Sequence, residues 1–424
     1  SFLLVDRARS SMNQSLAISI KKMVKIEELL CGLREASVAA RQQRSVSKKN
    51  SSTAVSIKGE REILIRTCGQ LYARWRSRGR VYRRVARAGG LPMHVRYIDT
   101  ATSPTLAEHK HNNKRTPVVL AIHGAPGSYE DFDFLIEHLK QQSVRVIAPN
   151  FPAMRETVST IFKHSADEKA AYLTDFLRAI QVDTIDLLIS HSSAVFPSLL
   201  MINERQINIR SLALFNPPGH RLPRSMKPTW FKCGSVKFYQ NKFGRAVFRL
   251  CGPQFLRIVG APVKVDNMDN VMLSATVMKH SRCKRVKEQL QQLSAMKLPT
   301  LLLFSENDKL IEKEIFYEMT HLMSLDSTKF DYYDENGKLE RSGSSDSDWI
   351  RVIVFKAGGH YSYLNYAPIV GQAITQLVHR VAPVSKLEQS QQQQVLTNNV
   401  TLHLPKDLNP IVTSLSNQIH LYGH

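Results

Sequence analysis

The segment PVVLAIHGAPGS, residues 117–128, decides the fold that we expect. It opens with a continuous apolar run of strand length, which is typical of a strand buried on both faces of a parallel sheet. The run ends at His123-Gly124, and small residues and proline then favour a turn. Ligands of open α/β sheets bind beyond the carboxyl ends of the strands, so we expect chemistry in this loop.

The sequence on both sides of this segment alternates apolar runs with amphipathic stretches of helical spacing. We expect further strands at residues 93–98, 144–148, 184–189, 212–215, 300–304 and 351–355. We expect helices at residues 132–141, 166–180 and 193–202. Strands that alternate with helices predict right-handed crossovers and therefore a doubly wound, mostly parallel α/β sheet.

The third buried strand along the chain runs into the sequence SHSSA, residues 190–194. This is the position of a nucleophile elbow, a tight strand-to-helix turn with the usual pattern Gly-x-Ser-x-Gly. Ser190 and Ala194 replace both glycines, which crowds the turn. Pro197, about one turn into the next helix, would cost up to ~3 kcal/mol in an unkinked helix interior. Taken alone, this stretch is better interpreted as a random serine cluster, and Ser192 is predicted as the nucleophile because of the residues that follow.

Two later strands also end in chemically useful residues. Residues SEND follow one strand and end at Asp308, and residues AGGH follow the other and end at His360. A serine hydroxyl needs a base to take its proton, and the imidazole of that base needs an acid to fix its tautomer. The chain order Ser192, Asp308, His360 predicts a Ser-His-Asp triad. The plainer interpretation makes Asp308 a helix N-cap and His360 one of 15 histidines.

The same loops offer donors for a developing oxyanion. The N–H groups of Ala125 and of Ser193 are the candidates, and losing one such donor typically costs about 2.7–4 kcal/mol of barrier lowering. A plain Gly/Pro turn is the alternative interpretation of the first loop. The five cysteines are scattered without a Cys-x-x-Cys pair, so we expect no disulfide framework and no structural zinc site. We also expect no metal ion and no cofactor at the site.

With these motifs in place, residues from about 93 to 380 resemble α/β-hydrolase-fold proteins. The stretches HGAPGSYEDFDFL, SENDKLIE and GGH are most similar to a family of uncharacterised hydrolase-like proteins abundant in nematodes. The resemblance implies an α/β-hydrolase fold with a helical cap inserted. It also implies a triad of Ser192, Asp308 and His360 and an oxyanion loop at Gly124 and Ala125.

The chain resembles, more broadly, the His-Gly-x-Pro-Gly group that contains epoxide hydrolases, dehalogenases and proline iminopeptidases. Epoxide hydrolases and dehalogenases attack with an aspartate from the elbow, whereas this chain has Ser192 there. The resemblance therefore implies a serine hydrolase that cleaves an ester, thioester or amide bond of a small molecule. Because both elbow glycines are replaced, a catalytically inactive binding or scaffold protein stays as the alternative.

Composition shifts divide the chain into parts. We expect a basic, partly helical or disordered N-terminal extension at 1–90, a core at 91–216 and 298–383, a helical cap at 217–297 and a polar tail at 384–424. Residues 20–34 and 60–88 of the extension are expected to be helix-prone. The acidic stretch at 326–348 is expected to loop out on the surface.

The formal net charge of +22 is concentrated in two segments. Residues 1–100 hold 21 Lys/Arg and 7 Asp/Glu, and residues 221–297 hold 16 and 3. In the first segment, arginines alternate with Tyr72, Trp75 and Tyr82, as on a nucleic-acid stacking surface. No recognition module accompanies them, so we do not expect nucleic acid as a partner. We expect a cytoplasmic protein, or a mitochondrial one if the basic arm is a transit segment.

The second basic segment is the expected cap. Its residues 236–250 place five apolar side chains on one helical face, namely Val236, Tyr239, Phe243, Val247 and Leu250. Lys242, Arg245 and Arg249 gather nearly opposite. Either the apolar face packs on the core and the cations are merely solvated, or the cap meets an anionic substrate or an acidic lipid surface. An apolar cap favours substrates of some hydrophobic character.

Overall fold

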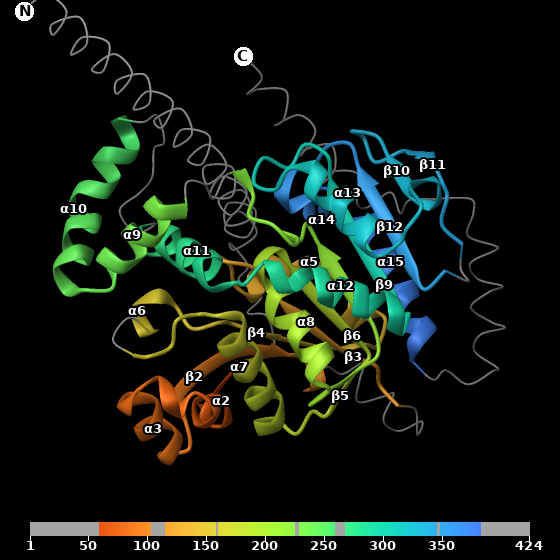
Figure 1. Ribbon diagram of the computed structural model, residues 1–424. Helices are drawn as coiled ribbons and strands as arrows, with labels where there is room; N and C mark the ends of the chain where they lie inside the picture. The colour runs from red at the N-terminus through yellow and green to blue at the C-terminus, as the bar shows by residue number, and fades with distance from the viewer. Residues whose placement is uncertain are drawn as a thin grey trace, which may run out of the picture. The chain divides into compact units, whose positions relative to one another are not determined.

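The computed structural model describes residues 59–102, 115–157, 160–224, 229–258, 268–345 and 348–382. The helix expected at 20–34 and the tail from 384 lie outside these residues. The described residues form a ten-stranded sheet in the order β1-β2-β4-β3-β6-β8-β9-β12-β10-β11 (Figure 1). Neighbours from β4 to β10 are parallel, and β1, β2 and β11 pair antiparallel. The expected doubly wound, mostly parallel α/β sheet is confirmed.

The strands of this sheet are β1 (Glu60–Thr67), β2 (Leu91–Asp99), β3 (Val118–Ile122), β4 (Arg145–Pro149), β6 (Leu187–His191), β8 (Leu212–Phe215), β9 (Thr300–Ser305), β10 (Asp331–Tyr333), β11 (Leu339–Arg341) and β12 (Ile350–Phe355). A separate two-stranded sheet joins β5 (Thr184–Ile185) to β7 (Asn208–Ile209). The helices of the core are α2 (Gly69–Arg74), α3 (Arg80–Arg87), α5 (Asp133–Gln141), α6 (Met154–Thr157), α7 (Ala166–Ala179), α8 (Val195–Glu204), α13 (Lys313–Leu322), α14 (Ser362–Asn365) and α15 (Ala367–Val381).

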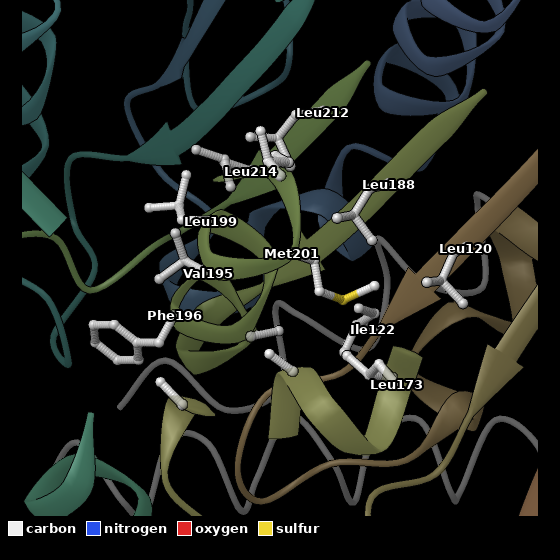
Figure 2. Close-up of a cluster of buried hydrophobic side chains, with 14 of the residues drawn as sticks. Leu120, Ile122, Leu173, Leu188, Val195, Phe196, Leu199, Met201, Leu212 and Leu214 are labelled. Atoms are coloured by element: carbon white, nitrogen blue, oxygen red, sulfur yellow. The ribbon is translucent and has the colours of Figure 1, made fainter. Parts of the chain in front are cut away.

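Two apolar cores cover the two faces of the sheet. Side chains of a strand alternate between faces, so Leu120 and Ile122 of β3 join one core, and Val119 and Ala121 join the other. Figure 2 shows the first core, where β3, β6 and β8 meet α7 and α8. Helices α5 and α15 cover the opposite face. Burial on both faces is what the continuous apolar run at 117–122 predicts.

The order of the strands indicates where a ligand could bind at the edge of the sheet. The chain passes from β3 to β4 on one side and later returns to β6 on the other side of β3. Such a reversal of strand order leaves a crevice beyond the carboxyl ends of the two strands. In the register of these strands Ile122 lies opposite Ser190. The loops that begin at His123 and at Ser192 therefore start side by side.

The helix expected from residue 60 onward is wrong for its first part, because residues 60–67 form β1. Every residue of β1 pairs with β2, from Glu60 opposite Ile98 to Thr67 opposite Leu91. Burial alternates along EREILIRT, with Ile65 and Thr67 buried and Leu64 and Arg66 exposed. This period of two is typical of a half-buried strand, and the many charges around it conceal the pattern in the sequence.

The aromatic side chains between the arginines of α2 and α3 pack inward. The rings of Tyr72, Trp75 and Tyr82 contact one another with centroid distances of 5.4–5.9 Å. Tyr72 is fully buried, and its hydroxyl donates a hydrogen bond to Glu168. Tyr72 is therefore not available to stack on a nucleic acid, and it anchors the basic helices to α7.

The acidic stretch at 326–348 is not a simple surface loop. It contributes β10, which extends the sheet in parallel with β12, and β11, which closes a short hairpin. Asp331 opens β10 fully buried and accepts hydrogen bonds from Ser342, Ser344 and Arg351. Those partners satisfy the buried carboxylate and fix the hairpin. The expectation that residues 326–348 loop out on the surface is therefore wrong.

Four helices lie between β8 and β9: α9 (Thr229–Tyr239), α10 (Lys242–Ile258), α11 (Met268–His280) and α12 (Lys284–Met296). Helices α9, α10 and α11 pack on one another, apart from the sheet (Figure 1), whereas α12 packs on α8 and α13. The chain breaks between α9 and α10, so the single apolar face expected at 236–250 is wrong. Val236 and Tyr239 are buried, but Phe243 and Leu250 are exposed.

Candidate active site

Ser192 occupies the turn between β6 and α8. The turn is a short 3₁₀ segment, Ser192–Ala194, that continues into α8. Ser192 has a φ of 52°, in the left-handed region that non-glycine residues rarely adopt. Strained positions of this kind occur where a fold must aim one side chain, as in a nucleophile elbow. The sequence prediction for this turn therefore matches its backbone.

The replacements for the elbow glycines fit without distorting the turn. Ser190 and Ala194 are fully buried. The hydroxyls of Ser190 and Ser198 hydrogen-bond each other, which satisfies both polar groups. Pro197 lies in the first turn of α8, where backbone N–H groups have no partner in the helix. The cost expected for a proline in the helix interior therefore does not arise.

His360 lies between the other two predicted residues. It follows β12 on a 3₁₀ turn, Gly359–Tyr361. The Ser192 Oγ lies 2.8 Å from His360 Nε2, and His360 Nδ1 lies 2.8 Å from Asp308 Oδ2. The carboxylate can only accept, so Nδ1 carries the proton and Nε2 accepts the hydrogen bond from the serine hydroxyl. The structure thus brings Ser192, His360 and Asp308 into one hydrogen-bonded chain.

Asp308 is held by donors on both of its oxygens. The backbone N–H groups of Leu310 and Ile311 donate to Oδ1 at 2.8 and 3.0 Å. The Asn216 side chain donates to Oδ2 at 2.9 Å. These donors fix the orientation of the carboxylate toward His360. Asp308 therefore accepts backbone hydrogen bonds as a helix N-cap would, which was the alternative interpretation, and it also binds His360.

Asn216 is a site residue that the sequence reasoning missed. It directly follows β8, is fully buried and has a φ of 44°, which asparagine tolerates better than most residues. Its side chain also donates to the Gly359 carbonyl at 3.2 Å and accepts from the Ser362 hydroxyl. The sequence pattern that located the triad residues, a polar residue at the end of a buried strand, also applies to Asn216.

The expected oxyanion loop lies against the elbow. A Cβ on Gly124 would stand 2.9 Å from the Ser192 Cβ, so only glycine fits without a shift. The His123 ring accepts a hydrogen bond from the Phe151 N–H at Nε2 and donates from Nδ1 to the Gly124 carbonyl, at 3.0 and 2.7 Å. These bonds fix the plane of the peptide that carries the Ala125 N–H.

Burial keeps two histidines of the site neutral. Burial lowers the pKa of His123 to about 3, and the nearby Lys169 contributes to the same lowering. Burial also holds the pKa of His191 well below its usual range, and the neighbouring His360 adds to this. The His191 Nε2–H donates to the His360 carbonyl at 3.1 Å. His191 therefore supports the loop of His360, a role the sequence reasoning did not assign.

A pocket opens in front of these groups. Its lining combines the loop Gly124–Pro126, the elbow residues His191, Ser192 and Ser193, and the side chains of His360, Tyr361, Pro218, Pro223, Leu310, Ile311, Ser274 and Met278. Ser274 and Met278 come from α11, and the Ser274 hydroxyl donates to the Ala125 carbonyl at 2.8 Å. All three residues expected around the oxyanion, Gly124, Ala125 and Ser193, thus face the pocket. Its walls are mainly apolar.

Within the described ranges, no group of three or more His, Cys, Asp or Glu side chains is arranged to hold a metal ion. In the same ranges, no helix has the length and apolar character needed to cross a membrane. Both findings concern the described residues alone.

Comparison with known proteins identifies a matching family and several similar structures. Residues 94–379 match the model of a family described as "Alpha/beta hydrolase of unknown function (DUF1057)". Similar solved structures include a thermophilic esterase from Thermogutta terrifontis, at 16% identity over 76% of this chain and 100% of that one, with a TM-score of 0.46. Another is a haloalkane dehalogenase from Bradyrhizobium elkanii, at 13% identity over 68% and 94%, with a TM-score of 0.43. No sequence among the curated proteins matches the chain.

Proposed function

Because this chain belongs to that family of alpha/beta hydrolases, we propose that it is a serine hydrolase with Ser192 as nucleophile, His360 as base and Asp308 as the acid that orients the base. The observation that carries the proposal is the hydrogen-bonded chain from Ser192 through His360 to Asp308, with both links at 2.8 Å. The alternative, an inactive relative, rests on the elbow substitutions, on Pro197 and on the inserted stretch at 326–348. The buried Ser190–Ser198 hydrogen bond and the place of Pro197 in the first turn of α8 support the enzyme instead.

The proposed reaction follows from this geometry. His360 Nε2 takes the Ser192 proton as Oγ attacks the carbonyl carbon, and Asp308 stabilises the imidazolium that forms. The N–H groups of Ala125 and Ser193 stabilise the oxyanion. Collapse of the intermediate expels the alcohol, thiol or amine, which takes the proton from His360, and leaves an acyl group on Ser192. Water, activated by the same histidine, then releases the acid.

The substrate that we propose is a small molecule with an ester, thioester or amide bond. The lining supports an apolar acyl group, because Pro218, Met278, Leu310 and Ile311 face the pocket. A small number of polar groups among apolar walls is typical of small-molecule sites. The cytoplasmic or mitochondrial location and the closer resemblance to the nematode family stay predictions.

Covalent labelling tests the proposal. A fluorophosphonate probe should label the folded wild-type chain, and Ser192→Ala should abolish labelling because it removes the attacking oxygen. Ser193→Ala is the matched control: it changes the adjacent hydroxyl but keeps the backbone N–H, so it should still be labelled. Wild-type protein that is folded yet unlabelled would refute the hydrolase and favour a binding protein of the same fold.

A further inference from the structure

The outermost helix of the cap, α10, exposes large apolar side chains to solvent. Phe243 is 72% exposed and Leu250 is 75% exposed. The two lie seven residues apart, which is two helical turns, so they share one face of α10. Phe238 at the end of α9 is 38% exposed and meets Phe243 edge-on, with ring centroids 6.1 Å apart. We call Phe238, Phe243 and Leu250 the α10 patch.

The charged residues of α9 and α10 themselves have one sign. Residues 229–258 contain six Lys or Arg residues and no Asp or Glu. Lys237, Lys242 and Arg249 are exposed on the described parts of α9 and α10. Lys242 directly precedes Phe243 and Arg249 directly precedes Leu250, so both cations flank the apolar pair about a quarter of a turn away around α10. An outward face with aromatic and leucine side chains flanked by cations is typical of helices that lie in a membrane interface.

The size of the α10 patch argues against a protein partner. Its exposed side chains together present on the order of 400 Å² if large apolar residues are taken at about 150–250 Å² each. A stable protein interface buries about 800 Å² on each partner. A bilayer requires no such area, because apolar side chains insert between headgroups while flanking lysine and arginine side chains bind anionic lipid. The charge and the size of the α10 patch thus both favour a lipid bilayer over a protein partner.

We propose that the α10 patch docks the cap on an anionic phospholipid bilayer. This surface stands apart from the proposed chemistry and does not depend on it. Phe238, Phe243 and Leu250 enter the interfacial layer, and Lys237 and Lys242 contact the anionic headgroups. Arg249 has a second contact, a bidentate ion pair with Asp269 of α11 at 2.8 and 3.1 Å.

The Arg249–Asp269 pair joins the docking helix to the wall of the pocket. Asp269 lies in the first turn of α11 and also accepts a hydrogen bond from the Tyr239 hydroxyl of α9. The same α11 carries Ser274, which holds the Ala125 carbonyl, and Met278, which lines the pocket. A bilayer bound to α10 would therefore lie against the helical unit that covers the site, so an apolar ligand could pass between lipid and pocket without crossing bulk water.

Vesicle binding by the full chain tests the proposal. Wild-type protein is sedimented with vesicles of phosphatidylcholine, with and without phosphatidylserine. We expect binding only with the anionic lipid and weaker binding at high salt, because exposed charges are screened. The double variant Phe243→Ser/Leu250→Ser should weaken binding about tenfold, since it removes the inserted side chains and no charge. Both positions are exposed, so the fold should be unaffected.

The matched control is Leu64→Ser/Leu339→Ser. These leucines are 59% and 45% exposed but lie on β1 and β11, outside the cap. The control should bind vesicles like the wild type, which separates the α10 patch from the other basic parts of the chain. Wild-type protein that ignores anionic vesicles, or a cap variant that binds like the control, would overturn the proposal. A wild-type dimer that dissociates only in the cap variant would also overturn it and identify a second copy as the occupant.

Discussion

The carboxyl edge of the sheet and the outer face of α10 differ in which kind of side chain they bury and which they expose. At the sheet edge, polar groups are buried and hydrogen-bonded: Asp308 is 6% exposed and Asn216 is fully buried, and both have several partners. On α10, apolar Phe243 and Leu250 stand in solvent. Burying a polar group requires compensating bonds, and exposing an apolar one forgoes stabilisation, so both regions depart from what folding alone favours.

The difference indicates what each region contributes. Strands packed on both faces hold the ends of β6, β8, β9 and β12 in fixed relative positions, so the residues there can be aligned within hydrogen-bond distance. Helix α10 packs on α9 and α11. A catalytic reaction requires precisely aligned groups, whereas binding to a lipid bilayer requires an exposed face away from the core. Substitutions in the first region should therefore change the rate of reaction, and those in the second should change where the protein binds.

The largest effect is expected at His360. His360→Ala removes the base for Ser192, and loss of one triad member typically costs about 10⁴-fold or more in kcat. The effect should appear in kcat toward a water-soluble aryl ester, with thermal stability close to wild type. A control at an exposed histidine, His94→Ala on β2, should keep full activity. Equal activity in the His360 variant would remove the contrast between the two regions.

The second prediction concerns Lys169 of α7, whose burial should make the stability of the fold depend on pH. Its side chain is 2% exposed, its ammonium lies 4.0 Å from the Phe151 ring centroid, and burial lowers its pKa to about 7. The folded state therefore binds fewer protons than the unfolded state between pH 7 and the ordinary lysine value, and stability rises with pH across that window. Lowering a pKa by one corresponds to about 1.4 kcal/mol of free energy.

The variant Lys169→Met should abolish this pH dependence. Relative to wild type it should be more stable by about 4 kcal/mol near pH 7, and the advantage should shrink as the pH rises toward 10. Urea unfolding of both proteins at each pH measures the difference. Lys163→Met, at an exposed position in the loop before α7, is the control and should leave the pH dependence unchanged. A constant difference across the window would contradict the lowered pKa.

Gly124 tests the close contact between the two loops of the site. Gly124→Ala would place a Cβ 2.9 Å from the Ser192 Cβ and 3.3 Å from the His191 carbonyl. We expect kcat to fall about 100-fold, comparable to the loss of one oxyanion donor, because the loop must shift away from Ser192. Gly234→Ala in α9 is the control, since a Cβ there meets no atom within 4 Å. Unchanged kcat in Gly124→Ala would mean that the loop does not serve the reaction.

Most of the sheet edge could be predicted from the sequence because buried strands leave long apolar runs. The strand ends then located Ser192, Asp308 and His360. Asn216 obeys the same rule and was missed, because asparagine before two prolines looks like a turn. The strand β1 was missed since its alternation is carried by few apolar residues among arginines, and β10 since it spans only Asp331–Tyr333.

The segment 217–297, which we expected to form a helical cap, was predicted least well, for a physical reason. A helical wheel shows which side chains share a face, but it cannot show which face meets a neighbour. The break at Gln240-Asn241 turned one expected face into a buried half on α9 and an exposed half on α10. Only the structure places Val236 inside and Phe243 outside.

The smallest effect is expected for Leu250→Ser. A side chain 75% exposed has little apolar contact to lose, so the free energy of unfolding should change by less than about 0.5 kcal/mol, and kcat/KM toward a water-soluble ester should stay within about twofold. Leu303→Ala in β9, where the side chain is fully buried, should instead cost about 2–5 kcal/mol. Because only the buried leucine contributes to folding, equal losses in the two variants would show that the outer face of α10 packs against the folded chain, and the contrast between the two regions would fail.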